Sequence, residues 1–141
     1  MRSIIGAHPS DDKTIIVTDM EAGVEHLSRR TVGHSDVMLI VAEPYFRSLQ
    51  TAAHIERMAR ELEIANVYVV ANKVRTEMDA AAIDKFASTR NLDIIATIPF
   101  DDDVAASSLL PSAPLDYCAD AAGVQAVASL AQTLEERFIG A

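Results

Sequence analysis

Four short runs of β-branched and other apolar residues recur along the chain and predict the strands of a sheet. They cover residues 14–18, 37–42, 67–71 and 94–98. The apolar residues within each run are consecutive rather than alternating with polar ones, which is typical of strands buried on both faces. The sequence therefore predicts about four strands, each covered on both sides.

Helical patterns lie between and after these runs, where apolar residues recur every three or four positions. The clearest covers 48–62, with Ser48 placed to cap its first turn, and two more cover 77–89 and 120–138. Strands that alternate with helices of this length predict an α/β fold, a mostly parallel sheet with helices on both faces. No repeat, linker or change of composition divides residues 1–141, so one domain is expected.

Composition and charge narrow the classes of function. Half of the residues are hydrophobic, but no run approaches the roughly 20 needed to cross a bilayer, and a soluble cytoplasmic protein without a membrane span is expected. The net charge of -9 argues against nucleic acid as a partner, because such binding relies on Lys and Arg to neutralise phosphates. Cys118 is the only cysteine, which excludes an internal disulfide or a paired-cysteine metal site within one copy and predicts a buried, inert thiol.

Polar and turn-forming residues follow each predicted strand. Ligands of open parallel sheets bind beyond the carboxyl ends of the strands, so these residues are candidates for a common site. Any one of them is also explained by a turn or a helix cap, whereas four such ends together favour a function. In chain order they are Asp19, Glu43 with Pro44, Asn72 with Lys73, and Pro99 with Phe100 and Asp101.

The first of these strand ends resembles the Walker B and switch II segment of the MinD, ParA and nitrogenase-iron-protein group of P-loop ATPases. The resemblance lies in an apolar run that ends at Asp19 and is followed by Ala22 and Gly23. Residues 19–29 are more similar still to the CooC-like ATPases that mature carbon monoxide dehydrogenase by nickel insertion. Later blocks match in the same order, and these are Glu43-Pro44, Arg47-Ser48-Leu49, Asn72-Lys73-Val74 and Ile98-Pro99-Phe100-Asp101.

This resemblance implies a ligand, ATP or ADP with Mg²⁺, and a role for each matching residue. Asp19 would hold the magnesium through water, and Gly23 would let the switch backbone approach the γ-phosphate. The amide of Asn72 would read the adenine, although it also fits as a turn cap. The remaining nucleotide-binding positions implied are Lys73, Pro99 and Asp101.

The phosphate-binding half of such a site has no counterpart in the sequence. A P-loop reads Gly-x-x-x-x-Gly-Lys-[Ser/Thr], and none of the five glycines fits this pattern. The family's switch I acid would also precede Met1. Phosphoryl transfer depends on positioning and charge stabilisation by these parts, so the chain by itself is not expected to hydrolyse nucleotide.

A metal hypothesis arises from the acidic and histidine-bearing segment that holds Glu21, Glu25, His26 and His34, since carboxylate and imidazole suit nickel or zinc. Solvated or helix-dipole roles explain such residues at the start of a helix more often. Nickel-inserting relatives bind metal through paired cysteines that this chain lacks. Arg30 also stands where those relatives commonly have a small residue.

Three interpretations remain open from the sequence. The first is a non-catalytic domain that keeps the scaffold and at most weak nucleotide binding, and acts through protein contacts. The second is one half of a split ATPase, whose P-loop-bearing partner chain covers an open edge of the sheet. The third is a homo-oligomer without a nucleotide role. In each, a homo-oligomer or a heteromer is expected, because a sheet that begins at the Walker B strand leaves apolar surface to cover.

Overall fold

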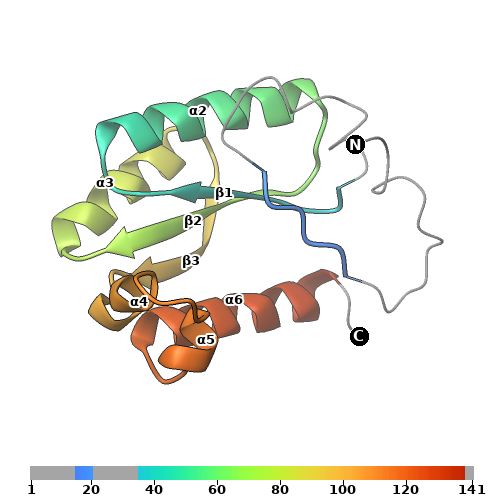
Figure 1. Cartoon of the computed structure of the whole chain (residues 1–141). Helices are drawn as coiled ribbons and strands as arrows, with labels where there is room; N and C mark the ends of the chain where they lie inside the picture. Colours follow the sequence, from blue (N-terminus) through green and yellow to red (C-terminus); the bar gives the residue numbers. More distant parts are fainter. Residues whose placement is uncertain (1–14, 21–34, 139–141) are drawn as a thin grey trace.

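The computed structural model describes residues 15–20 and 35–138 (Figure 1). Within these ranges three parallel strands form a sheet in the order β1-β2-β3. The elements in chain order are β1 (Met38–Ala42), α2 (Phe46–Glu61), β2 (Val67–Val74), α3 (Glu77–Ser88), β3 (Asp93–Pro99), α4 (Asp102–Ser107), α5 (Pro114–Tyr117) and α6 (Ala122–Phe138).

The helices lie on both faces of the sheet, as predicted. Helices α2 and α3 cover one face, while α6 and the short helices α4 and α5 lie on the other (Figure 1). Parallel strands joined by helices confirm the predicted α/β class. The central strand β2 is buried from both sides, since Val69, Val70 and Ala71 expose at most 2% of their surface.

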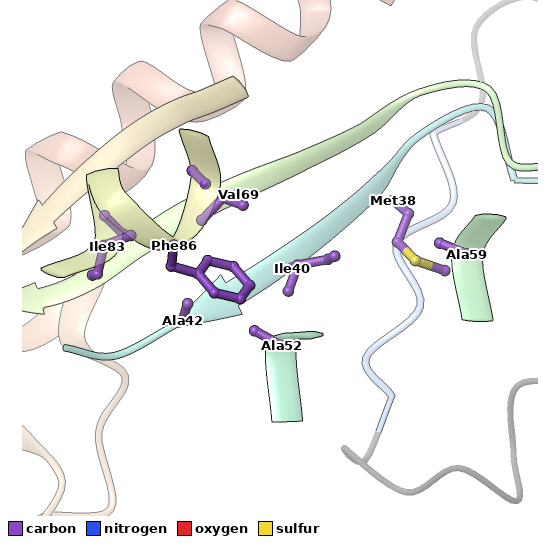
Figure 2. Close-up of a cluster of buried hydrophobic side chains, with 10 residues drawn as sticks. Met38, Ile40, Ala42, Ala52, Ala59, Val69, Ile83 and Phe86 are labelled. Carbon is purple, nitrogen blue, oxygen red and sulfur yellow. The ribbon is translucent and has the colours of Figure 1, made fainter. Parts of the chain in front are cut away.

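The main core lies between the sheet and helices α2 and α3. Ile40 and Ala42 of β1 point toward the same layer as Ala52 of α2 and Phe86 of α3 (Figure 2). Alternate residues of a strand share a face, so Met38, Ile40 and Ala42 are all buried. Burial of this apolar surface is the principal force that holds the two helices on the sheet.

Strand β1 differs from the prediction that every strand is buried on both faces. Its burial alternates, and Val41 is 58% exposed although Ile40 beside it is 1% exposed. The reason is the position of α6, which packs against β3, so that no described element covers β1 on that face. The prediction is therefore right for β2 and wrong for β1.

The strand predicted at 14–18 is not formed in residues 15–18, and Thr14 lies outside the described residues. Ile15, Ile16 and Val17 are 56%, 47% and 88% exposed, and the segment runs across the direction of the strands (Figure 1). Met20 nevertheless packs against the core. A strand exists only where a neighbour supplies ladder hydrogen bonds, and no described strand pairs with this segment.

The helices follow the predicted pattern with local corrections. Helix α3 ends within one residue of the prediction, and Thr76 and Asp79 form a capping box at its start. Helix α2 begins two residues earlier than predicted, so Ser48 lies inside it and does not cap it. Its hydroxyl instead accepts a hydrogen bond of 2.9 Å from the backbone N–H of Glu43. Within 15–20 and 35–138, every helix is too short or too polar to span a bilayer.

Candidate functional site

The carboxyl ends of the three strands meet at one edge of the sheet, marked by the arrowheads in Figure 1. Glu43 follows β1, Asn72 and Lys73 lie near the end of β2, and Pro99 ends β3. Asp101 is the residue before α4. The structure thus brings four of the six predicted site residues to the edge where ligands of parallel sheets bind.

Lys73 links the ends of β1 and β2. Its Nζ lies 3.0 Å from Oε1 of Glu43, and the side chains of Lys73 and Glu43 are 54% and 27% exposed. The backbone of Lys73 has φ 55°, and the pairing of β2 with β3 shifts register between Ala71 and Val74. A left-handed, non-glycine residue in a bulge at a strand end is a feature found often beside binding sites.

Asn72 stands next to this bulge and is partly buried. Its Oδ1 accepts a hydrogen bond of 3.0 Å from the backbone N–H of Lys73. Its amide nitrogen makes no hydrogen bond to any residue that the structure describes. Toward the described residues the amide thus has donors to spare, which suit a ligand with acceptor atoms such as a purine ring.

A contact that the sequence analysis missed lies between the loops after β2 and β3. The guanidinium carbon of Arg75 is 3.6 Å from the ring centroid of Phe100, and the N–H of Phe100 donates to the carbonyl of Val74 at 3.0 Å. A cation over an aromatic face is attracted by the ring quadrupole. The stack places two planar groups at the carboxyl-terminal edge of the sheet, in the loops that follow β2 and β3.

The turn that contains Arg75 could have been predicted from the sequence. The carboxylate of Asp79 accepts from the backbone N–H groups of Arg75 and Thr76 at 2.9 and 3.1 Å, so the capping box fixes the turn in which Arg75 stands. The spacing Thr76-x-x-Asp79 could have located that turn. The partner Phe100 could not be found this way, because it belongs to another loop.

Asp101 has a structural role at the edge. One carboxylate oxygen accepts from the N–H groups of Asp103 and Val104 at 3.0 and 3.2 Å, and the other accepts from Gly123 at 3.0 Å. Donation from Gly123, then from Val104, lowers the pKa of Asp101 below its ordinary value of 3.8. A Cβ on Gly123 would lie 3.2 Å from the Asp101 Cβ, so the small residue permits this approach.

The other predicted residues lie nearer the start of the chain. Asp19 belongs to the described segment 15–20, which forms no strand, and its predicted role at this edge stays a prediction. Gly23, Arg30 and the metal candidates Glu21, Glu25, His26 and His34 fall in 21–34, outside the described residues. In the part that is described, no group of three or more potential metal ligands occurs.

Cys118 is partly rather than fully buried. Its Sγ lies 3.3 Å from the carbonyl oxygen of Pro114 and donates to it. Burial raises the pKa of the thiol, and the negative charges of Asp101 and Asp103 raise it further. A protonated thiol is a weaker nucleophile than a thiolate. The inert character of Cys118 stays a prediction.

Comparisons with known proteins agree with the resemblance predicted from the sequence. No family model matches the chain. MJ0685, an ATP-binding protein of Methanocaldococcus jannaschii, is 42% identical over 96 residues, which make up 67% of this chain and 38% of MJ0685. CooC, a carbon monoxide dehydrogenase accessory protein of Rhodospirillum rubrum, is 42% identical over 95 residues, 67% of this chain and 35% of CooC. The chain is homologous to part of these proteins. It spans little more than a third of their length.

The fold is likewise that of part of a larger domain. The cell division protein MinD of Aquifex aeolicus superposes with a TM-score of 0.65 at 21% identity, over 79% of this chain and 48% of MinD. At that identity the likeness concerns the fold. Together the comparisons confirm the predicted resemblance to CooC-like and MinD-like proteins over part of their length.

Proposed function

We propose that this chain is a non-catalytic CooC- and MinD-like domain, which binds adenine nucleotides weakly and acts through contacts with other proteins. The observation that carries the proposal is the edge of the sheet where Asn72 lies near the end of β2 and the Arg75–Phe100 stack joins the loops after β2 and β3. An amide pairs with the polar rim of a purine, and planar groups stack on its face. The homologous MJ0685 is an ATP-binding protein, which supports this assignment.

Binding is expected to be weak because the chain has no counterpart to the phosphate-binding part of the site. The 141 residues contain no P-loop motif. Base contacts alone support a Kd in the millimolar range, or about -4 kcal/mol. The same lack of a phosphate nest and lysine predicts no magnesium-dependent ATP hydrolysis above a buffer control.

Calorimetric titration with adenosine and with Mg·ADP tests the base site. We expect the two ligands to bind with similar affinity, because phosphate contributes little, and Asn72→Ala to weaken both about tenfold. Gln132→Ala is the matched control, since it removes an exposed amide from α6. Submicromolar binding of Mg·ADP, or binding indifferent to Asn72→Ala, would overturn the proposal.

A second candidate is one half of a split ATPase, favoured by the outer side of β1. No described strand pairs with the outer edge of β1, and Val41 leaves an apolar side chain exposed on its uncovered face. Unpaired edges readily accept a further strand. A P-loop-bearing chain that docked there would supply the missing phosphate contacts.

The split interpretation is tested by refolding this chain together with a P-loop-bearing fragment of CooC and measuring ATP hydrolysis. Restored magnesium-dependent turnover near one per second, reduced by Asn72→Ala, supports it. A stable complex without turnover would favour the non-catalytic domain, and the absence of a complex would remove the split candidate.

A further inference from the structure

A groove lined by residues of α2, of α3 and of the turn that follows α3 runs between these two helices. It has a volume of about 750 Å³. The part of the groove near the start of α2 is apolar. Phe46 is 73% exposed there, and Leu49 and Phe86 contribute to the wall. We call it the α2–α3 groove.

Cations also line the α2–α3 groove. Arg57, Lys85 and Arg90 all border it, and the guanidinium of Arg90 lies 4.5 Å from the Phe86 ring centroid. Glu56 is the one acid among the lining residues, and it is 8% exposed and paired with Arg60. The groove is therefore locally positive on a chain whose net charge is -9.

A surface of complementary character lies on α4, α5 and the loop between them. Its apolar members are exposed, with Leu109 at 86% and Leu115 at 66%, and Leu110 and Tyr117 are close to half exposed. Exposed acids stand among them, and these are Asp102, Asp103 and Asp116. We call residues 102–117 the α4–α5 surface. An exposed apolar patch with charged neighbours is typical of a protein contact site.

The two surfaces lie on opposite faces of the sheet, so they cannot meet within one chain (Figure 1). We propose that the α4–α5 surface of one copy docks in the α2–α3 groove of a second copy. Leucines would enter the apolar end of the groove, and the aspartates would face Arg57, Lys85 and Arg90. The repulsion between two chains of charge -9 is screened beyond roughly 8 Å at physiological salt, whereas charges in contact still attract.

Such a contact is heterologous, because it joins two different surfaces. Each bound pair leaves one groove and one α4–α5 surface unoccupied, so association continues into longer chains unless the geometry closes a ring. The average mass should then rise with concentration rather than stop at a dimer. This assembly does not rest on nucleotide binding, and calorimetry with adenosine tests that function separately.

Analytical ultracentrifugation of two blocked variants tests the contact. The groove variant carries Arg57→Glu with Lys85→Glu, and the surface variant carries Leu109→Ser with Leu115→Ser. All four side chains are exposed, so both variants are expected to fold, as circular dichroism will verify. Arg137→Glu with Val127→Ser is the matched control, because it makes changes of the same kind on the exposed side of α6.

We expect the wild type and the control to exceed 15.2 kDa increasingly between about 10 and 300 μM, and each blocked variant to remain at 15.2 kDa. An equimolar mixture of the two blocked variants should form a species of about twice that mass and no larger, because one intact contact remains. A wild type that stays monomeric overturns the proposal. So do blocked variants that still associate, which would indicate another surface such as the β1 edge, and a mixture that fails to pair.

Discussion

The ends of β2 and β3 and the outer side of β1 differ in the interactions that hold them. At the ends of β2 and β3, side chains are tied to backbone groups by the Thr76–Asp79 capping box and by Asp101. On the outer side of β1, the described residues offer an unpaired edge and an exposed Val41. The comparison shows that hydrogen bonds from polar side chains fix the ends of β2 and β3, whereas the outer side of β1 depends on what covers it.

The largest expected effect is a difference in unfolding free energy between substitutions on the two faces of β1. Ile40→Ala should cost about 3 kcal/mol of unfolding free energy, because it opens a cavity in the core beneath α2. Val41→Thr, one residue along, should change it by less than about 0.5 kcal/mol, as surface substitutions usually do. Urea unfolding measures both. Equal losses would show that the second face of β1 is covered in solution and would end the comparison.

The next effect concerns Asp101, whose carboxylate holds three N–H groups of α4 and α6. Its pKa is lowered in the folded chain, so the stabilisation is present above its ordinary value of 3.8 and is lost as pH falls through the lower folded value. Asp101→Asn should therefore lower the melting temperature at pH 7 and make progressively less difference between pH 4 and pH 2.

The control for Asp101 is Asp116→Asn, an exposed acid in α5. It should leave the melting temperature at pH 7 nearly unchanged. A constant difference between wild type and Asp101→Asn from pH 7 to pH 2 would show that the charge on Asp101 does not hold α6 at the edge.

A smaller effect is expected at the start of α3. Thr76→Ala should cost about 1 kcal/mol, since the side chain accepts from the N–H of Asp79 at 3.1 Å. Thr51→Ala is the matched control, because Thr51 lies inside α2 and alanine is the better helix former there. Chemical denaturation decides the point, and a loss at Thr51 equal to that at Thr76 would argue against capping as the cause.

The smallest effect is predicted for the Lys73–Glu43 pair. Lys73→Met should change stability by no more than about 0.5 kcal/mol, because Lys73 is half exposed and solvent screens the pair. A double-mutant cycle with Glu43→Gln should give a coupling that falls with added salt. A coupling above about 1.5 kcal/mol that ignores salt would mean that this end of the edge is more enclosed than its exposure indicates.

The sequence located most elements because their signals are local. The continuous apolar run at 67–71 lies in β2, and the predicted helix at 77–89 differs from α3 by one residue at its end. It also placed Asn72, Lys73, Pro99 and Asp101 at one edge, since parallel strands end on the same side. Their roles toward a nucleotide stay predictions.

Only the tertiary structure decided the features that depend on residues far apart in the sequence. The apolar run at 14–18 looked like a strand, yet 15–20 has no described partner to supply hydrogen bonds. Val41 is exposed because α6 packs over β3 instead. Phe100 meets Arg75, and Asp101 meets Gly123, only once separate loops and α6 have docked. Local patterns define turns and periodicity, whereas pairing and burial are set by the elements that happen to lie opposite, which no short stretch of sequence encodes.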